Sequence, residues 1–461
     1  MKTAEEHFAE EVHNSIEHFG KILRPDFRTM PDKPLETLFL ISLSVFLGAD
    51  NIYQVLQVLG LPKTATYNRV KDVSVYYFQG FLQKHLSDLA IPLLSERLLK
   101  SDSSNSRDGF VLAIDDSVIA RLGTKLGYVC SLWTGQLKRV TKGQDVIALV
   151  LVIGDVILPL DVRIVSKPGK NLKTKPEIYQ EMLASALARF KEAGIDTSRL
   201  TTTGDAAYFS KKVAEFCPGE SQTLCEPDTN ENCLEINDEI SNLDKEKTTL
   251  KTDLQDIDSQ LPDPSTLPIL KGVFQGKDNY VFDIDGESKK ASLWRSILKE
   301  ELKPQWGTDN QPVHRTPAYS KTFGHVILVF YIPKGKRAVS YLIIVGKPLL
   351  RYEALHAFAF HHRVEEFWKL LKDTFEILDM QLQSREGAHA CVAIKIISYL
   401  IVNMMKPNLR KLKRFKNITI NKLVRLCPKF VDVQQIFKEH FHEIIPENYT
   451  LDKALARFLE R

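Results

Sequence analysis

Apolar and polar residues follow two different periods along this 461-residue chain. Four short β-prone runs occupy residues 109–117, 145–153, 156–165 and 200–205. The turn Gly154-Asp155 joins the second and third runs into a predicted hairpin. A helix is predicted from Lys175 to about Ala193, with Pro176 in its first turn. The order strand, hairpin, helix and strand predicts an α/β unit.

A second helix is predicted for the stretch Phe358 to Lys372. Its apolar residues recur at spacings of three and four, at Phe360, Val364, Phe367, Leu370 and Leu371. Glu365, Lys369 and Lys372 lie on or near the opposite face, so the helix presents an acid beside two bases. A solvated face with an i,i+4 pair between Glu365 and Lys369 is the alternative reading of these charges.

Two of the predicted strands run into aspartate. The first reaches Asp115-Asp116, and the fourth ends at Asp205. Open α/β sheets place their chemistry at strand ends. Together with Glu365, these carboxylates form an acidic triad of the hard oxygen ligands that a pair of Mg²⁺ ions requires.

This arrangement resembles a family, the DDE transposases of the IS4-like group. Asp-Ser follows the first strand, Gly-Asp follows a later one, and a helix carries Glu-x6-Lys. The helix signature of the family is Tyr-x2-Arg-x3-Glu-x6-Lys. Glu365 and Lys372 match it, whereas Phe358 replaces the Tyr and His361 replaces the Arg. Arg363, close by on the helix, offers a replacement positive charge, although Arg and His differ in how they donate hydrogen bonds.

The resemblance implies an RNase H-like mixed sheet with a β-rich insertion, preceded by a helical domain and followed by a basic helical tail. It implies that Asp116, Asp205 and Glu365 hold two Mg²⁺ or Mn²⁺ ions. Asp116 is preferred to Asp115 because Ser117 follows it, as Ser or Thr follows the Asp of the family. The reaction implied is cleavage of transposon ends and their transfer to target DNA. DNA phosphates would be bound there by Lys372, Arg363 and His361. The implied protein is a prokaryotic, cytoplasmic, nucleoid-associated homodimer.

The N-terminal part, residues 1–105, is predicted to be helical and to bind DNA. Residues 35–59 read as two helices, Gly60-Leu61-Pro62 as a turn, and residues 63–71 as a third helix. This resembles a helix-turn-helix, with base or phosphate contacts from Thr64, Thr66, Asn68 and Arg69. An ordinary αα-hairpin within a helical domain is equally compatible with the pattern.

The predicted catalytic core has two parts, residues 106–216 and 336–405, separated by an insertion at residues 217–335. Heptad spacing over residues 234–262 predicts a long helix that either self-associates or packs on its own domain. Strands are predicted at residues 279–285, 324–331 and 339–345 in the β-rich part. Trp306 is a candidate for a flipped DNA base, with a core position as the alternative.

The last segment, residues 406–461, is predicted to be a basic helical region. It follows a predicted apolar helix from Ala388 to Met405. Residues 406–429 contain nine Lys or Arg and no acid, which is a phosphate-binding pattern. Its candidate DNA contacts are Arg410, Lys413 and Arg414. A solvated basic face is the alternative.

Composition adds little to this picture. A formal net charge of +4 argues neither for nor against nucleic acid. Six scattered cysteines predict free thiols in a reducing compartment, and Cys217, Cys225 and Cys233 lack the pairs typical of zinc sites. No signal peptide or membrane span is predicted, since the apolar runs are interrupted or short.

Two other functions stay open. A catalytically inactive or domesticated relative would keep DNA binding without cleavage, and Phe358 and His361 are the residues that favour it. An RNase H-like nuclease acting on hybrids or junctions would use the same carboxylates on another substrate.

Overall fold

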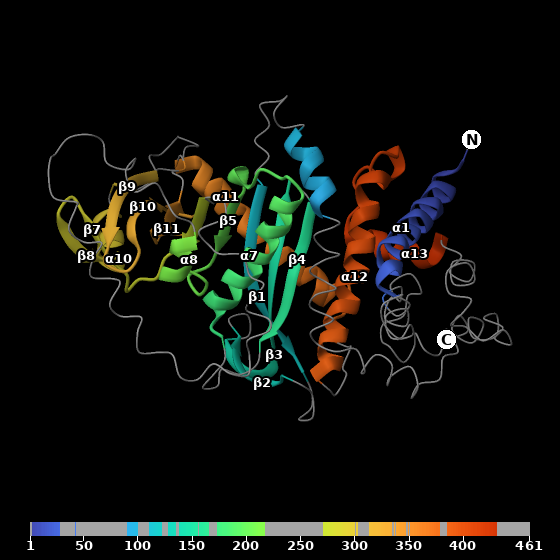
Figure 1. Cartoon of the computed structure of the whole chain (residues 1–461), viewed down its shortest axis with the longest axis horizontal. Helices are drawn as coiled ribbons and strands as arrows, with labels where there is room; N and C mark the ends of the chain where they lie inside the picture. The colour runs from blue at the N-terminus through green and yellow to red at the C-terminus, as the bar shows by residue number, and fades with distance from the viewer. Residues whose placement is uncertain are drawn as a thin grey trace. The chain divides into compact units, whose positions relative to one another are not determined.

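The computed structural model describes residues 2–27, 42, 90–99, 110–121, 128–134, 138–154, 156–165, 173–216, 271–299, 301–302, 313–333, 336, 338–346, 349, 351–378 and 385–430. The fold is mixed α/β with a large mixed sheet (Figure 1). The chain divides into two compact units. Unit 1 comprises Met1–Asp108, Ala113–Leu172 and Phe360–Arg461, and unit 2 comprises Gly109–Leu112 and Lys173–Ala359.

The sheet strands of unit 1 are β1 (Phe110–Ala120), β2 (Cys130–Thr134), β3 (Arg139–Ile153) and β4 (Val156–Val165). The first three residues of β1 belong to unit 2, so this strand is shared. β4 pairs with β3 in antiparallel register, and the predicted hairpin is confirmed, with Gly154 at a φ of 59° in the turn. β3 is longer than predicted, because it begins six residues before Asp145.

One helix forms the apolar centre of unit 1. α12 (Arg385–Leu409) is buried almost throughout and packs on β4, where the carbonyl of Ile157 accepts hydrogen bonds from Tyr399 Oη at 2.9 Å and Asn403 Nδ2 at 3.1 Å. The predicted apolar helix is thus confirmed, and it is longer than expected. Its stretch Gly387–Leu409 has the length and composition of a membrane span, and most of that stretch is buried inside the protein.

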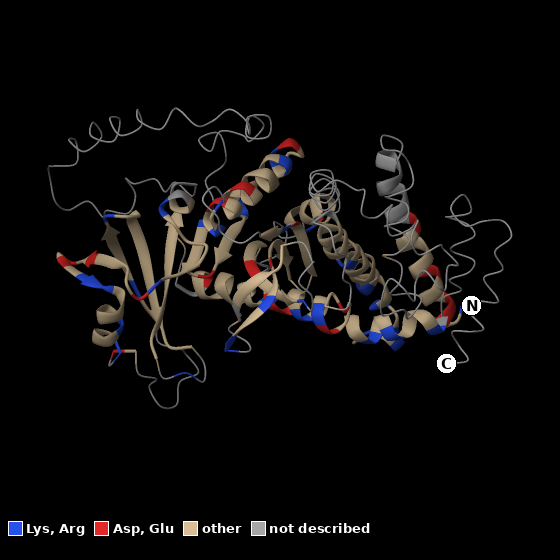
Figure 2. Ribbon diagram, turned by 90° about the horizontal axis from the view of Figure 1, so that it is seen from below, with Lys and Arg blue, Asp and Glu red and all other residues tan. Residues whose placement is uncertain are grey.

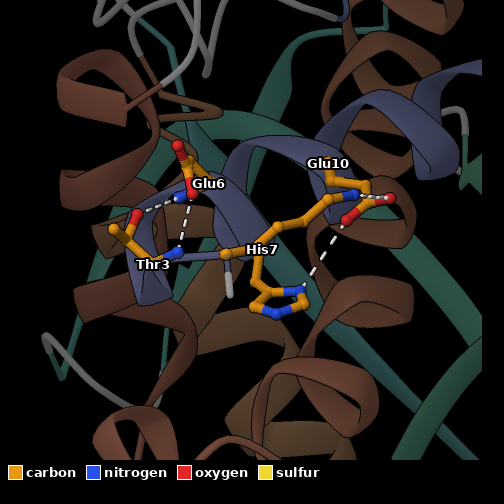
Figure 3. A network of polar contacts seen from close by, with 5 residues as sticks. Thr3, Glu6, His7 and Glu10 are labelled. Carbon is orange, nitrogen blue, oxygen red and sulfur yellow. Dashed lines mark hydrogen bonds and ion pairs between the residues drawn. The ribbon is translucent and has the colours of Figure 1, made fainter.

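The chain's first helix packs on its basic C-terminal segment. α1 (Ala4–Phe27) begins with a reciprocal cap between Thr3 and Glu6, beside Glu10 and His7 (Figure 3). Further along α1, the ring of Phe8 lies 5.5 Å from that of Phe415. The basic segment itself contains η4 (Lys413–Phe415) and α13 (Ile420–Phe430).

Unit 2 contains one helix-covered parallel strand pair and a β-rich part. The elements are α7 (Lys175–Glu192), η1 (Thr197–Arg199), β5 (Thr201–Gly204), α8 (Lys211–Phe216), β6 (Lys271–Gln275), β7 (Val281–Ile284), β8 (Glu287–Lys290), α10 (Ala291–Ile297), β9 (Val313–Ser320), β10 (Gly324–Tyr331) and β11 (Ser340–Gly346). β5 and β6 are parallel, whereas β6, β11, β10 and β9 are antiparallel to one another in turn.

Hydrogen-bonded strands follow the order β2-β3-β1-β5-β6-β11-β10-β9-β7-β8, with β4 on β3. β1 lies in unit 1 from Ala113 onward, and it begins in unit 2 with residues 110–112. There the carbonyl of Leu112 accepts a 3.3 Å hydrogen bond from Thr202 Oγ1 of β5. α11 (Arg351–Asp373) likewise contributes its first residues to unit 2 and its last residues to unit 1.

Candidate metal and nucleic-acid-binding site

The two neighbouring aspartates of β1 lie inside the strand. Asp115 and Asp116 are half-buried, and the strand continues through the buried Ile119 to Ala120. The expectation that the first carboxylate lies at the exit of its strand is therefore wrong, because the β-branched residues after Ser117 extend the strand. Adjacent strand residues point to opposite faces, so only one of the two aspartates can face a given helix.

Glu365 occupies an unusual place on α11. Residues 361, 365, 368 and 372 are spaced four, three and four apart, so they form one row along the helix. His361 is 4% exposed and Trp368 3% exposed, while the side chain of Glu365 in the same row is 61% exposed. The residues before and after Glu365 in this row are therefore buried, while the Glu365 carboxylate itself reaches solvent. Its Oε1 lies 3.1 Å from Nδ1 of the exposed His362.

Lys372 is the basic end of that row and faces β1. Burial lowers the pKa of its ammonium group, and the negative charges of Asp115 and Asp373 oppose that shift. Asp115 is therefore the β1 carboxylate close enough to act on Lys372 electrostatically. This electrostatic effect favours Asp115 as the strand carboxylate on the side of α11, whereas the family pattern favours Asp116.

Asp205 directly follows β5, as predicted from the sequence. Its Oδ1 accepts a 2.7 Å hydrogen bond from the backbone N–H of Ala207, and its carbonyl accepts one from Tyr208 N at 3.2 Å. These bonds form an Asx-type turn, which fixes the direction of the carboxylate as the chain leaves the strand.

An aromatic core holds this turn in place. Tyr208 and Phe209 are almost fully buried. The ring of Phe209 stacks on Phe274 of β6 with centroids 5.0 Å apart, and it lies 4.6 Å from Phe323. Aromatic packing of this kind is rigid, so the residues that follow Asp205 anchor it within unit 2.

The three predicted metal ligands are divided between the units. Asp116 and Glu365 belong to unit 1, and Asp205 belongs to unit 2. Within the part of the chain that the structure describes, no group of three or more His, Cys, Asp or Glu side chains is arranged to hold a metal ion. The ligand types nevertheless suit Mg²⁺, since all three are carboxylates and the aspartate and glutamate side chains of unit 1 reach solvent.

His361 does not have the surroundings of a phosphate ligand. Burial, with a smaller effect from the charge of His362, lowers its pKa from 6.5 to about 4, so the imidazole is neutral at pH 7. Its predicted contact with a DNA phosphate required a protonated, accessible ring. The structure argues against that contact, because the side chain is packed inside unit 1.

Acid should therefore destabilise the protein through His361. The unfolded chain binds a proton with a pKa of 6.5 and the folded chain only near 4, so stability is lost as the pH falls from 6.5 to about 4. This pKa shift corresponds to a loss of about 3 kcal/mol in the free energy of unfolding. Urea unfolding across this pH range should show that the His361→Gln variant loses about that much less stability than the wild type. His362→Gln, at an exposed position, should follow the wild type, and parallel curves for His361→Gln and the wild type would contradict the assignment.

The other cations of the predicted site differ in how available they are. Arg363 Nη1 lies 2.8 Å from the Glu366 carboxylate one turn away, so part of its charge is already compensated. Arg414 pairs with Glu5 of α1, and Arg410 Nη2 donates to the carbonyl of Ile418 at 3.4 Å. Lys413 is exposed.

The sequence singled out Arg410, Lys413 and Arg414 in the basic segment but did not show which of its residues face solvent. In α13, Lys422, Arg425 and Lys429 are exposed at spacings of three and four, opposite the buried Leu423 and Cys427. Figure 2 shows the basic α13 beside α1, which carries acidic residues. A helical-period analysis of residues 420–430 would have identified this row.

Several predicted contacts lie outside the described residues. These are the predicted DNA contacts Thr64, Thr66, Asn68, Arg69 and Trp306. The predicted heptad helix 234–262 and the cysteines Cys217, Cys225 and Cys233 also lie outside them. Comparison of the chain with protein-family models and with curated proteins gave no match.

Proposed function

We propose that this protein is a DNA transposase that cleaves the ends of a mobile element and joins their 3′-hydroxyl groups to target DNA. The order β4-β3-β1-β5-β6 carries this proposal, because acidic residues lie on or directly after two adjacent strands of it, β1 and β5. α7 connects β4 to β5, and β5 is parallel to β6. This order supports an RNase H-like core, although β6 falls within residues 217–335, which were expected to be an insertion; the β-rich part between β6 and β11 lies mostly in the same range.

The residues have separate roles in this proposal. Asp205, Glu365 and one of the two β1 aspartates bind divalent ions, which when bound activate a hydroxyl nucleophile and stabilise the leaving oxygen. Lys372, whose ammonium group feels the negative charge of Asp115, neutralises a neighbouring phosphate of the substrate. The exposure of Glu365 between buried neighbours gives DNA access to the carboxylate. A homodimer would bring two element ends together.

Substrate choice tests the proposal. The purified protein, with Mg²⁺ or Mn²⁺, should nick duplex DNA that carries the inverted repeats flanking its gene and then join those ends to a second duplex. Activity restricted to RNA–DNA hybrids or branched junctions would point instead to an RNase H-like nuclease.

A DNA-binding protein without catalysis is the second candidate, favoured by the neutral, buried His361 in place of the family's arginine. Under that reading the protein binds the repeats but leaves both strands intact, with or without metal. The same assay therefore separates all three functions.

A further inference from the structure

A two-stranded ribbon extends from the end of β1 in unit 1. β2 pairs with the first part of β3, so that Thr134 lies opposite Arg139 and Cys130 opposite Gly143. Beyond Gly143, β3 becomes continuously buried, whereas Arg139, Val140 and Lys142 are exposed. We call residues 130–134 and 138–142 the β2–β3 ribbon.

The β3 strand of this ribbon meets solvent on both faces, whereas Thr134 of β2 is buried. Neighbouring residues on a strand point to opposite faces, and Arg139 and Val140 are adjacent and both exposed, Val140 to 60%. A strand that packs on a core on one side shows alternating burial instead. A two-stranded ribbon is only marginally stable by itself, so its anchorage is important.

The ribbon is anchored where it leaves the sheet. Arg121 N donates to the carbonyl of Lys142 at 3.1 Å, and the buried Arg121 side chain donates to Gln144 Oε1 at 2.8 Å. At the same level, a Cβ on Gly143 would lie 2.7 Å from the carbonyl oxygen of Ile119, so only glycine permits this close approach to β1. The direction of the ribbon is therefore fixed by the core.

Its charges have no partners among the residues that the structure describes. Lys138, Arg139 and Lys142 are exposed and make no ion pair there, and the described part of the ribbon contains no acidic residue. Lys138 in the turn and Arg139 and Lys142 at the start of β3 are three uncompensated cations within five residues, and their local positive field attracts polyanions. The absence of ion pairs leaves them available to phosphates.

We propose that the β2–β3 ribbon holds the backbone of duplex DNA, with Lys138, Arg139 and Lys142 on phosphates. A two-stranded ribbon fits the major groove of B-DNA, which is about 12 Å wide. The ribbon begins at the level of Arg121, five residues after Asp116. Five strand residues span about 16 Å. That length corresponds to about five base-pair steps. Resting on the proposed function, this places the ribbon on DNA flanking the cleaved bond.

Salt-dependent DNA binding tests this role. Affinity for a fluorescent duplex is measured by anisotropy between about 50 and 200 mM salt, with Ca²⁺ replacing Mg²⁺ so that cleavage does not interfere. The triple variant Lys138→Gln, Arg139→Gln, Lys142→Gln should reduce the magnitude of the salt slope by about 2.7, because each lost phosphate contact contributes about 0.9. Affinity at about 100 mM salt should fall at least tenfold.

The matched control removes the same charge elsewhere. Lys299, Lys321 and Lys336 are exposed lysines of unit 2, and their triple Gln variant should keep the wild-type salt slope. An unchanged slope in the ribbon variant, or an equal fall in both variants, would overturn the ribbon proposal while leaving the nuclease proposal intact. A wild-type protein that binds no duplex would overturn both. Circular dichroism melting verifies that each variant is folded.

Discussion

Replacing Asp205 with Asn is expected to lower Mg²⁺-dependent cleavage of duplex DNA by roughly a thousandfold, the scale on which a single group in a preorganised electrostatic site acts. Asn keeps the side-chain oxygen that accepts the hydrogen bond from Ala207 N, so the turn after β5 should persist. Only the negative charge, and with it the strength of the metal ligand, is removed. The measurement is the single-turnover rate of strand nicking with saturating enzyme.

The control for this prediction is Asp196→Asn in the same unit. Asp196 Oδ1 accepts a hydrogen bond from Ser198 N at 2.9 Å, which is the same two-residue turn geometry. It caps η1 and does not follow a sheet strand, so its replacement should leave the nicking rate within about twofold of the wild type. Equal rates for Asp205→Asn and Asp196→Asn would remove Asp205 from the site. Asp115→Asn and Asp116→Asn in the same assay identify the β1 ligand.

Replacing Arg121 with Met should produce the largest loss of stability, a fall of at least about 3 kcal/mol in the free energy of unfolding. Arg121 is 4% exposed and donates to Gln144 Oε1 and to the carbonyls of Ile377 and Leu378 at 2.9 and 3.1 Å. Met fills a similar volume but donates no hydrogen bond, so these buried acceptors lose their partner. Urea unfolding followed by circular dichroism provides the measurement.

Arg425→Met is the matched control, because Arg425 lies on the exposed face of α13. Its effect should stay within about 0.5 kcal/mol. If Arg121→Met were no more destabilising than this control, the Arg121 hydrogen bonds could not be what fixes the segment after α11, at Ile377 and Leu378, against β1 and β3.

Much of the strand pattern could be predicted because its signal is local. β10 begins and ends at the predicted residues, and the β3–β4 hairpin follows from its apolar runs and its glycine turn. β2, β6 and β8 are four or five residues long, and β8 (Glu287–Lys290) contains no apolar residue. Their pairing depends on neighbours distant in sequence, which no local period reveals.

The candidate site could be predicted only in part for the same reason. Asp205 was found because a strand end and its turn are local features. The proximity of Asp115 to Lys372 joins residues more than 250 positions apart, and the burial that neutralises His361 depends on the packing of α11 in unit 1. The pairing of Arg414 with Glu5 likewise depends on α1 meeting the C-terminal segment. Tertiary contacts decided these features, although Asp115, Lys372, His361 and Arg414 had been identified by type.

The central claim is that three carboxylates distant in sequence share divalent ions. Electron paramagnetic resonance of Mn²⁺ titrated into the protein bound to its inverted-repeat DNA tests it most directly, by counting bound ions independently of cleavage. We predict two bound ions per active site for the wild type and the loss of at least one in both Asp205→Asn and Glu365→Gln. Ion counts that are the same in the wild type and both variants would contradict the account.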